Sequence, residues 1–421
     1  MTAAAMTRAT ARRKERTGVQ RERHQPSYPL LVAVVGLVAA GVVMVYSASS
    51  VRAYFASDDP AMYGLQQLVF AAIGLAAMFL ASRADFRWFR YLAIVGYVVT
   101  MALLVAVLIP GIGSEVAGSR RWIFLPVIGG FQPAELAKLA IILYLAHWFD
   151  RRGAAARSFW NGLVPFALLV APGFLLVALE PDLGTAGVYV AATLAVFFMA
   201  GANLIYLGAI GTAVGGAVAF MITSTPYQLQ RLENFLDPFR DPLHSGYNAI
   251  QSLMALAQGG ITGMGLGASR QKFLYLPAPS TDFIFAIIGE EWGLVGTLVV
   301  VALFLVIAYQ GYRIAITAPD TFSGLLACGI TTWLVVQAFI NMAVVTALAP
   351  VTGIPLPFIS YGGSALTINL VAVGILLSIS RETTQTGSLL DAVFGVGRRD
   401  RRAHLPRAGR RTGAARRAAR T

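Results

Sequence analysis

Long apolar stretches alternate with short polar ones along most of the chain. A helix needs about 20 mostly apolar residues to cross roughly 30 Å of hydrocarbon. Ten segments meet or approach that length: 29–49, 64–82, 91–110, 133–149, 161–179, 183–200, 203–223, 281–310, 322–349 and 364–380. The pattern predicts an all-α polytopic membrane protein with about ten transmembrane helices. Residues 29–380 form its membrane domain, and a large extracytoplasmic loop, 224–280, lies between spans seven and eight.

One stretch of this loop, 245–258, has a different pattern. Ile250, Leu253, Met254 and Ala257 follow the i, i+3, i+4, i+7 spacing of one helix face, and glutamines occupy another face. This pattern predicts an amphipathic helix that lies in the outer membrane interface.

Basic residues set the predicted orientation. The short loops 83–90 and 150–157 are rich in arginine, and cytoplasmic loops carry an excess of Lys and Arg. Threading ten spans then places both loops and both termini in the cytoplasm. The same threading leaves several basic residues outside: Arg52, Arg120, Arg121, Arg231, Arg240, Arg270 and Lys272. Either they bind an anionic ligand on the outer face, or they pair with the acidic residues of the same loops.

Composition agrees with a membrane protein and locates the charge. Residues of the AVILMFWYC set make up 57% of the chain and charged residues only 13%, a balance that excludes a soluble domain. The net charge of +13 lies in the tails, because 1–28 holds seven basic and two acidic residues and 381–421 holds eleven and three. We expect two basic cytoplasmic tails near anionic lipid, the second one disordered, and no binding of nucleic acid. The single cysteine, Cys328, excludes a disulfide framework within the chain.

Span four carries two ionisable residues near its start. Pro133 suits the first turn of a helix, where its missing N–H costs nothing. Glu135 and Lys138 are three residues apart and share a face. They form a structural ion pair, or else Lys138 faces an anionic head group and Glu135 sets its position.

Span five ends at Glu180, Pro181 and Asp182. The proline ends the helix, and Asp182 can cap the helix that follows. A metal site or a sugar-hydroxyl site is the alternative, although two carboxylates without further ligands are a weak metal signal.

A glycine-rich segment, 259–267, precedes Arg270 and Lys272. Closely spaced glycines let backbone N–H groups approach an anion, and the two cations would add charge. The segment lacks the Gly-Lys-Ser/Thr ending of a phosphate-binding Walker loop. A flexible turn that re-enters the membrane is the alternative.

Asp282 precedes a long apolar helix, so it can act as an N-cap. It also lies where the basic outer segment meets the membrane. A half-buried carboxylate there can serve as a general base, because burial raises its pKa toward the working pH. Glu290 and Glu291 lie two turns deeper, where capping does not explain them.

These same residues carry a resemblance to a known family. The chain is similar to the SEDS family, the FtsW/RodA/SpoVE polytopic proteins that build peptidoglycan. The matching motifs are VYSASS at 45–50, SRRWI at 119–123, FQPAELAK at 131–138, EPDLGT at 180–185, GYNAIQ at 246–251, SRQKFLYLP at 269–277, TDFIFA at 281–286 and PVTGIPLPFISYGGS at 350–364. They follow the family's order across nearly the whole membrane domain. Two departures are Ala134 in place of the usual serine, and Ala278 with Ser280 before the TDF motif.

The resemblance implies a glycosyltransferase that polymerises lipid II on the outer leaflet. A growing glycan on undecaprenyl pyrophosphate is the donor, and the GlcNAc 4-hydroxyl of lipid II attacks its anomeric carbon to give a β-1,4 link. Asp282 matches the family's catalytic aspartate. The substrate-binding candidates are Arg120, Arg121, Trp122, Glu135, Lys138, Glu180, Asp182, Arg270, Lys272 and Ser360. No cofactor is certain, but Mg²⁺ or Mn²⁺ held by the pyrophosphate is a candidate.

The resemblance also implies partners and a location. A class B penicillin-binding protein transpeptidase and other division proteins are the expected partners, in the bacterial inner membrane at the division septum. The opening motif, the 269–273 segment and the long basic ends are more like the FtsW branch, which acts in division, than the RodA branch, which acts in elongation. The alternatives are a RodA-like elongation polymerase, a lipid II flippase with a charge relay, and a division scaffold without activity.

Overall fold

The computed structural model describes residues 25–116, 119–125, 129–243 and 246–382. Most of them are helical, and a helix lies at each of the ten predicted apolar segments. The bounds of these helices are α2 Tyr28–Ser57, α3 Met62–Arg83, α4 Arg87–Leu108, α5 Pro133–Arg152, α6 Val164–Leu179, α7 Leu183–Met199, α8 Leu204–Ser224, α11 Ile284–Ile316, α12 Thr321–Val345 and α13 Gly363–Ser380. Two further helices, α9 (Pro226–Leu236) and α10 (Tyr247–Gly259), lie in the predicted large loop.

Eight of the described helices are long and apolar enough to cross a membrane. Of the other two, α7 has 17 residues, and α5 begins with the Glu135 turn and ends with Arg151 and Arg152. The mostly helical, multi-pass architecture is thus confirmed, whereas the count of ten spans stays a prediction. The two basic tails lie almost wholly outside the described residues.

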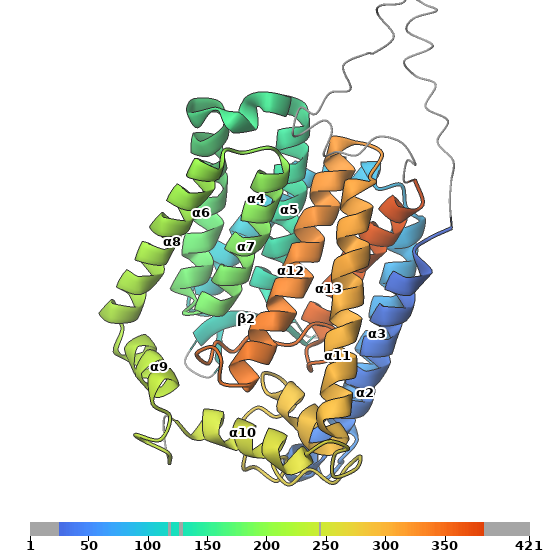
Figure 1. Cartoon of the computed structure of the whole chain (residues 1–421), viewed down its shortest axis with the longest axis vertical. Helices are drawn as coiled ribbons and strands as arrows, with labels where there is room; N and C mark the ends of the chain where they lie inside the picture. The colour runs from blue at the N-terminus through green and yellow to red at the C-terminus, as the bar shows by residue number, and fades with distance from the viewer. Residues whose placement is uncertain (1–24, 117–118, 126–128, 244–245, 383–421) are drawn as a thin grey trace, which may run out of the picture.

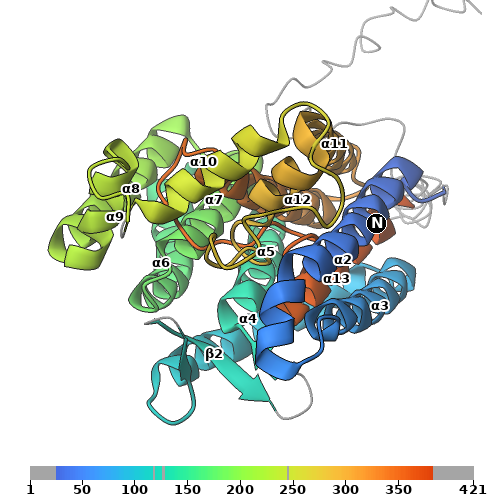
Figure 2. The ribbon, with the colours of Figure 1, turned by 90° about the horizontal axis from the view of Figure 1, so that it is seen from below.

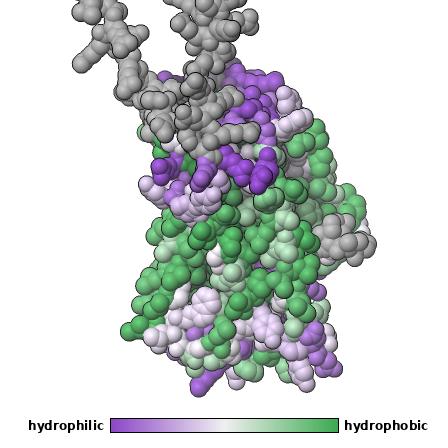
Figure 3. Space-filling model, turned by 90° about the vertical axis from the view of Figure 1, so that its right-hand side faces the viewer, coloured by the Kyte–Doolittle hydropathy of each residue, from purple (hydrophilic) through white to green (hydrophobic). Residues whose placement is uncertain are grey.

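The long helices stand side by side, and the two ends of the described chain lie at the same end of the bundle (Figure 1). We call this the termini end. The opposite end carries a small β-sheet, α9 and α10, and we call it the sheet end. Viewed from there, α10 and β2 lie on different sides of the bundle (Figure 2). On the side of the bundle that Figure 3 shows, apolar residues form a band across the middle, and polar residues gather toward the two ends.

Helix α12 is central to the bundle. It packs on α5, α7 and α11, and its Trp333 and Leu334 are completely buried. Helix α3 packs along α13. In contrast, α8 lies at the edge of the bundle, and none of its residues, all of which are described, is buried. The core therefore forms around α12, and α8 presents its apolar surface outward.

The sequence pattern did not predict the small sheet at the sheet end. Strands β1 (Ser114–Val116), β2 (Ser119–Leu125) and β3 (Gly129–Phe131) pair in that order, each pair antiparallel. Ile123 pairs with Phe131, which places β3 directly before Pro133 and the start of α5. The segment between α4 and α5 is therefore paired backbone rather than an open loop.

Helix α11 contains a break that ties it to the segment after α10. Gly293 has φ 67° and ψ −164°, a conformation that is essentially restricted to glycine. The backbone N–H groups of Met264 and Gly265 donate to the carbonyl oxygens of Glu290 and Glu291. In return, the N–H groups beyond the break donate to carbonyl oxygens of the glycine-rich segment. The backbone N–H and C=O groups that the break leaves without helical partners are thus hydrogen-bonded by the segment packed against α11.

One local prediction is wrong, and another is confirmed in part. Asp282 is not the N-cap of α11, because the helix begins later, at Ile284, and its N-cap residue is Phe283. The predicted amphipathic helix is present as α10, and its placement in the outer interface stays a prediction. The face that α10 buries in the protein consists of Ser252, Ala255 and Gly259. Small residues allow close packing of α10 on α11, so the larger apolar residues of the predicted face stay partly or fully exposed.

Candidate functional site

The candidate site is centred on Asp282 in the turn that precedes α11, at the sheet end of the bundle. Two side chains hold the backbone of this turn. Ser360 donates a hydrogen bond of 2.6 Å to the carbonyl oxygen of Thr281 and accepts one of 2.7 Å from the N–H of Leu356. Asn341 of α12 donates hydrogen bonds of 2.8 Å to the carbonyl oxygens of both Asp282 and Ile354.

These bonds join three segments that are distant in sequence. The 350–364 segment, the end of α12 and the Asp282 turn form one fixed unit, because each bond engages a backbone group rather than a mobile side chain. Sequence reasoning identified Ser360 but missed Asn341, which is only 2% exposed. An amide side chain inside a predicted span was a signal that could have revealed it, because such groups are costly in hydrocarbon.

Charged groups from three other elements act on the Asp282 carboxyl. Burial raises the pKa of Asp282, the positive charges of Arg121 and Arg231 lower it, and the negative charge of Asp182 raises it. Gly353, with φ 72°, lies so close that an added Cβ would come within 3.5 Å of Asp282 Oδ2. The carboxyl is therefore a half-buried acid on which two cations act, and its proton affinity is higher than that of an ordinary aspartate.

Asp182 is bound into the same region. It caps α7, accepting a hydrogen bond of 2.9 Å from the N–H of Thr185. Its Oδ2 lies 3.4 Å from the guanidinium of Arg121 and accepts a bond of 3.3 Å from Gln132. The predicted capping role is confirmed, and the same carboxylate also holds Arg121 of β2 near Asp282.

Glu180 is the unusual neighbour. It is fully buried, neither carboxyl oxygen has a hydrogen-bond partner, and burial raises its pKa to about 9. The nearby Asp182 also raises this pKa, whereas Arg121 lowers it. Glu180 is thus a neutral acid at neutral pH. The hydroxyl of Ser119 donates to its backbone carbonyl oxygen, which links β2 to the end of α6.

Glu135 and Lys138 of α5 form the ion pair that their spacing allows. Lys138 Nζ lies 2.7 Å from Glu135 Oε1, and both side chains are fully buried. The same amine donates a bond of 2.6 Å to Gln337 and lies 5.0 Å from the ring centroid of Trp333. Gln337 in turn donates to the carbonyl oxygen of Pro355. The pair thus supports the 350–364 segment from inside the bundle.

Backbone groups in and after the glycine-rich segment bind other groups of the chain itself. The carboxylate of Glu290 accepts a bond of 2.7 Å from the N–H of Arg270 and one of 2.5 Å from the hydroxyl of Ser269. Lys272 Nζ donates to the carbonyl oxygen of Gly267 at 2.5 Å and lies 3.6 Å from Glu291. The chain's own carboxylates therefore bind the hydroxyl and N–H groups that follow the glycines, and an outside anion at the glycine N–H groups stays a prediction.

The remaining candidates lie farther from the centre or at the surface. The side chain of Arg270 is exposed. Arg120 is 41% exposed at its side chain and lies 3.5 Å from Glu115, an exposed ion pair. The ring of Trp122 packs against Gly130 of β3. The structure therefore brings together Asp282, Asp182 and Arg121, with Glu180 beside them.

Comparisons with known proteins cover most of the chain. The family model FtsW/RodA/SpoVE, described as a cell cycle protein, matches residues 28–385. Stage V sporulation protein E of Bacillus subtilis is 44% identical over 86% of this chain and 98% of its own length. A probable peptidoglycan glycosyltransferase FtsW of Trichlorobacter lovleyi is 43% identical over 83% of this chain and 92% of its own.

The fold also has a solved counterpart. A chain from a peptidoglycan synthase complex, studied for its coordination of polymerization and crosslinking, superposes with a TM-score of 0.70. It is 31% identical in sequence and covers 86% of this chain and 99% of its own.

Proposed function

The chain belongs to the FtsW/RodA/SpoVE family of cell cycle proteins, and from this premise we propose that it polymerises lipid II into β-1,4 glycan strands during septal wall synthesis. It is a membrane glycosyltransferase. One observation carries the proposed chemistry: the Asp282 carboxyl is fixed through its own backbone, is half-buried and is influenced by Arg121 and Arg231.

Asp282 acts as the general base in this proposal. The 4-hydroxyl of the acceptor GlcNAc is a weak nucleophile, so a positioned base must take its proton as the oxygen bonds to the anomeric carbon of the donor. The bond from that carbon to the pyrophosphate oxygen breaks, and the anomeric configuration inverts. A raised pKa suits this role, because a more basic carboxylate is a better proton acceptor near neutral pH.

The leaving pyrophosphate gathers negative charge in the transition state. Fixed cations stabilise that charge more than they stabilise the ground state. Arg121 is best placed for this role, because Asp182 holds its guanidinium and its charge acts on Asp282. We assign the exposed Arg120 and Arg270 to the approach of the anionic substrate, with Trp122 at the interface.

The buried cations have a structural role in this proposal. Lys138 is neutralised by Glu135 and Lys272 by Glu291, and both lysine side chains are buried. We propose that they hold the segments that carry the site, rather than bind pyrophosphate directly. Ser360 likewise positions the Asp282 turn.

A divalent cation can reach the site with the pyrophosphate of the substrate. Within the described residues, no group of three or more His, Cys, Asp or Glu side chains is arranged to hold a metal ion. We therefore propose that Mg²⁺ or Mn²⁺, where it takes part, is held by the pyrophosphate oxygens, and that the residues named above act on the sugar and the leaving group.

The similar chain from a synthase complex supports a class B penicillin-binding protein transpeptidase as the partner. The FtsW relatives support a role in division, and thus other division proteins as partners at the septum. We place the sheet end outside the cytoplasm, because lipid II is polymerised on the outer leaflet. Both tails are then cytoplasmic.

The test is polymerisation of labelled lipid II by the purified full-length chain, with and without the transpeptidase. We expect glycan from the wild type and none from folded Asp282→Asn, whose amide cannot accept the proton. Asp59→Asn, which changes an exposed aspartate at the same end, is the control. Equal polymer from wild type and Asp282→Asn would remove Asp282 as the base. No polymer from the wild type, even with the partner, would favour the flippase or scaffold alternative.

A further inference from the structure

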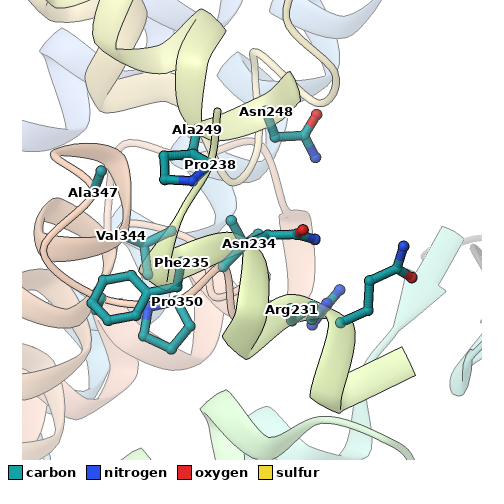
Figure 4. Close-up of a pocket in the computed structure, with 12 residues that line it drawn as sticks. Arg231, Asn234, Phe235, Pro238, Asn248, Ala249, Val344, Ala347 and Pro350 are labelled. Carbon is teal, nitrogen blue, oxygen red and sulfur yellow. The ribbon is translucent and has the colours of Figure 1, made fainter. Parts of the chain in front are cut away.

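A cavity of about 220 Å³ lies at the sheet end, between α9, α10 and the segment after α12 (Figure 4). Its lining combines two kinds of side chain. Phe235 and Pro350 lie on one side, whereas the side chains of Asn234, Asn248 and Arg231 extend on the other. Gln230 adds a further amide to the lining.

This combination matches the chemistry of an N-acetylated sugar. A pyranose ring has apolar C–H faces, which pack on aromatic and proline rings, and a rim of hydroxyl and acetamido groups. Amide side chains offer both donors and acceptors to such groups. The three amides, Gln230, Asn234 and Asn248, outnumber the single cation Arg231, so the lining suits a neutral polar ligand better than a phosphate, which is bound by several cations.

Two lining residues connect the cavity to the proposed base. Val351 lines it, and two residues later Gly353 faces Asp282 Oδ2. Arg231 lines it as well, and its positive charge lowers the pKa of Asp282. A sugar in the cavity would therefore contact the same segment and the same cation that act on the Asp282 carboxylate.

We propose that this cavity binds the N-acetylated amino sugar of the acceptor, with Asn234 and Asn248 bonding its hydroxyl and acetamido groups. The inference rests on the proposed function, since it assigns the cavity to the acceptor of that reaction. It makes these amides determinants of acceptor affinity, whereas Asp282 determines the rate of the chemical step.

The first test measures polymerisation kinetics as a function of lipid II concentration, with the full-length chain and its transpeptidase partner. A neutral hydrogen bond contributes about 0.5–1.5 kcal/mol, and 1.4 kcal/mol is tenfold in affinity. Asn234→Leu and Asn248→Leu are therefore expected to raise KM for lipid II by up to about tenfold and to leave kcat nearly unchanged. Gln258→Leu, an exposed amide of α10 outside the cavity lining, is the matched control and keeps the wild-type KM.

The second test is independent of polymerisation. Saturation-transfer NMR with the lipid-free GlcNAc–MurNAc disaccharide is expected to show binding to the wild type and to Gln258→Leu, and reduced binding to Asn248→Leu. The exposed Gln230→Leu serves where the asparagine variants do not fold.

The outcomes separate the two proposals. An active wild type with unchanged KM in both asparagine variants overturns the sugar site and leaves the proposed function in place. An inactive wild type overturns the proposed function, and the disaccharide experiment still decides whether the cavity binds an amino sugar. Equal disaccharide signals from the wild type and the cavity variants would overturn the sugar site.

Discussion

The side-chain amide of Asn341 donates a hydrogen bond of 2.8 Å to the backbone carbonyl oxygen of Asp282. The same nitrogen also donates to the carbonyl oxygen of Ile354. Asn341 therefore connects the proposed base, the 350–364 segment and the central helix α12. The amide touches the backbone and not the reacting carboxylate, so its role is to position Asp282.

Replacing Asn341 with alanine should impair the chemical step. Misplacement of a catalytic group by about 1 Å can lower a rate by roughly 10²-fold. We expect Asn341→Ala to reduce kcat for polymerisation on that scale, with little change in KM. Asn369→Ala, which removes a buried amide from α13, is the control. A rise in KM at constant kcat would contradict a positioning role.

The buried Glu135–Lys138 pair should behave as one unit. Removal of one partner of a buried ion pair typically costs about 3–5 kcal/mol, because the remaining charge is left uncompensated. We expect Lys138→Met and Glu135→Gln each to lower the free energy of unfolding on this scale, and the double variant to lose much less than the sum. Thermal unfolding in detergent, with a double-mutant cycle, measures this. A stable but inactive Lys138→Met protein would instead place Lys138 on a substrate head group.

Gly293 should be irreplaceable in α11. Its backbone conformation is restricted to glycine, and an added Cβ would collide with the backbone N of Gly263. We expect Gly293→Ala to lower the free energy of unfolding by about 1–3 kcal/mol through backbone strain, and by more through the collision. Gly187→Ala, at an exposed helical position of α7 with open space around it, should be neutral or stabilising by about 0.5–1 kcal/mol. Unfolding midpoints that respond equally to the two substitutions would argue against the break as a structural requirement.

The helices could be predicted from the sequence because hydrophobic length is a local property. The apolar segments and the Asp182 cap followed from neighbouring residues alone. The small sheet was missed because three short strands with glycine and arginine have no apolar periodicity. Asp282 was found through its motif, but its fixed backbone depends on Asn341, 59 positions away.

The glycine-rich segment shows the same limit. Its glycines and following cations predicted a cradle for an outside anion. The N–H of Arg270, just after the glycines, is instead bound by the carboxylate of Glu290 of α11, about 20 residues later. The sequence also singled out Glu290 as unexplained by capping. A tertiary contact joins these two observations, and no spacing along the chain indicated it.

Glu180 should make the stability of the protein depend on pH. Its pKa is about 9 in the folded protein, above the ordinary value of 4.5, so the folded state binds a proton that the unfolded state releases between these values. Stability contributed by the neutral acid is thus complete below about pH 4.5 and is lost as pH rises through about 9. Glu180→Gln keeps the shape without the titration. We expect the unfolding midpoint of this variant to rise relative to that of the wild type as pH increases from 6 to 9. A difference between the two midpoints that does not change with pH would contradict a buried neutral acid.

The acid limb of the pH–rate profile should report the carboxyl of Asp282. A general base works only when deprotonated, so polymerisation falls as pH drops through its pKa, which burial raises above the ordinary aspartate value. The positive charge of Arg121 lowers this pKa.

Arg121→Gln should therefore move the acid limb to higher pH, in addition to any loss of rate from weaker binding of pyrophosphate. Arg120→Gln, next to it but paired with Glu115, should leave the position of the limb unchanged. The quantity to compare is the midpoint of the acid limb in kcat. Weaker stabilisation of the leaving pyrophosphate lowers kcat at every pH and leaves this midpoint in place. A limb that moves to lower pH in Arg121→Gln would show that another group titrates.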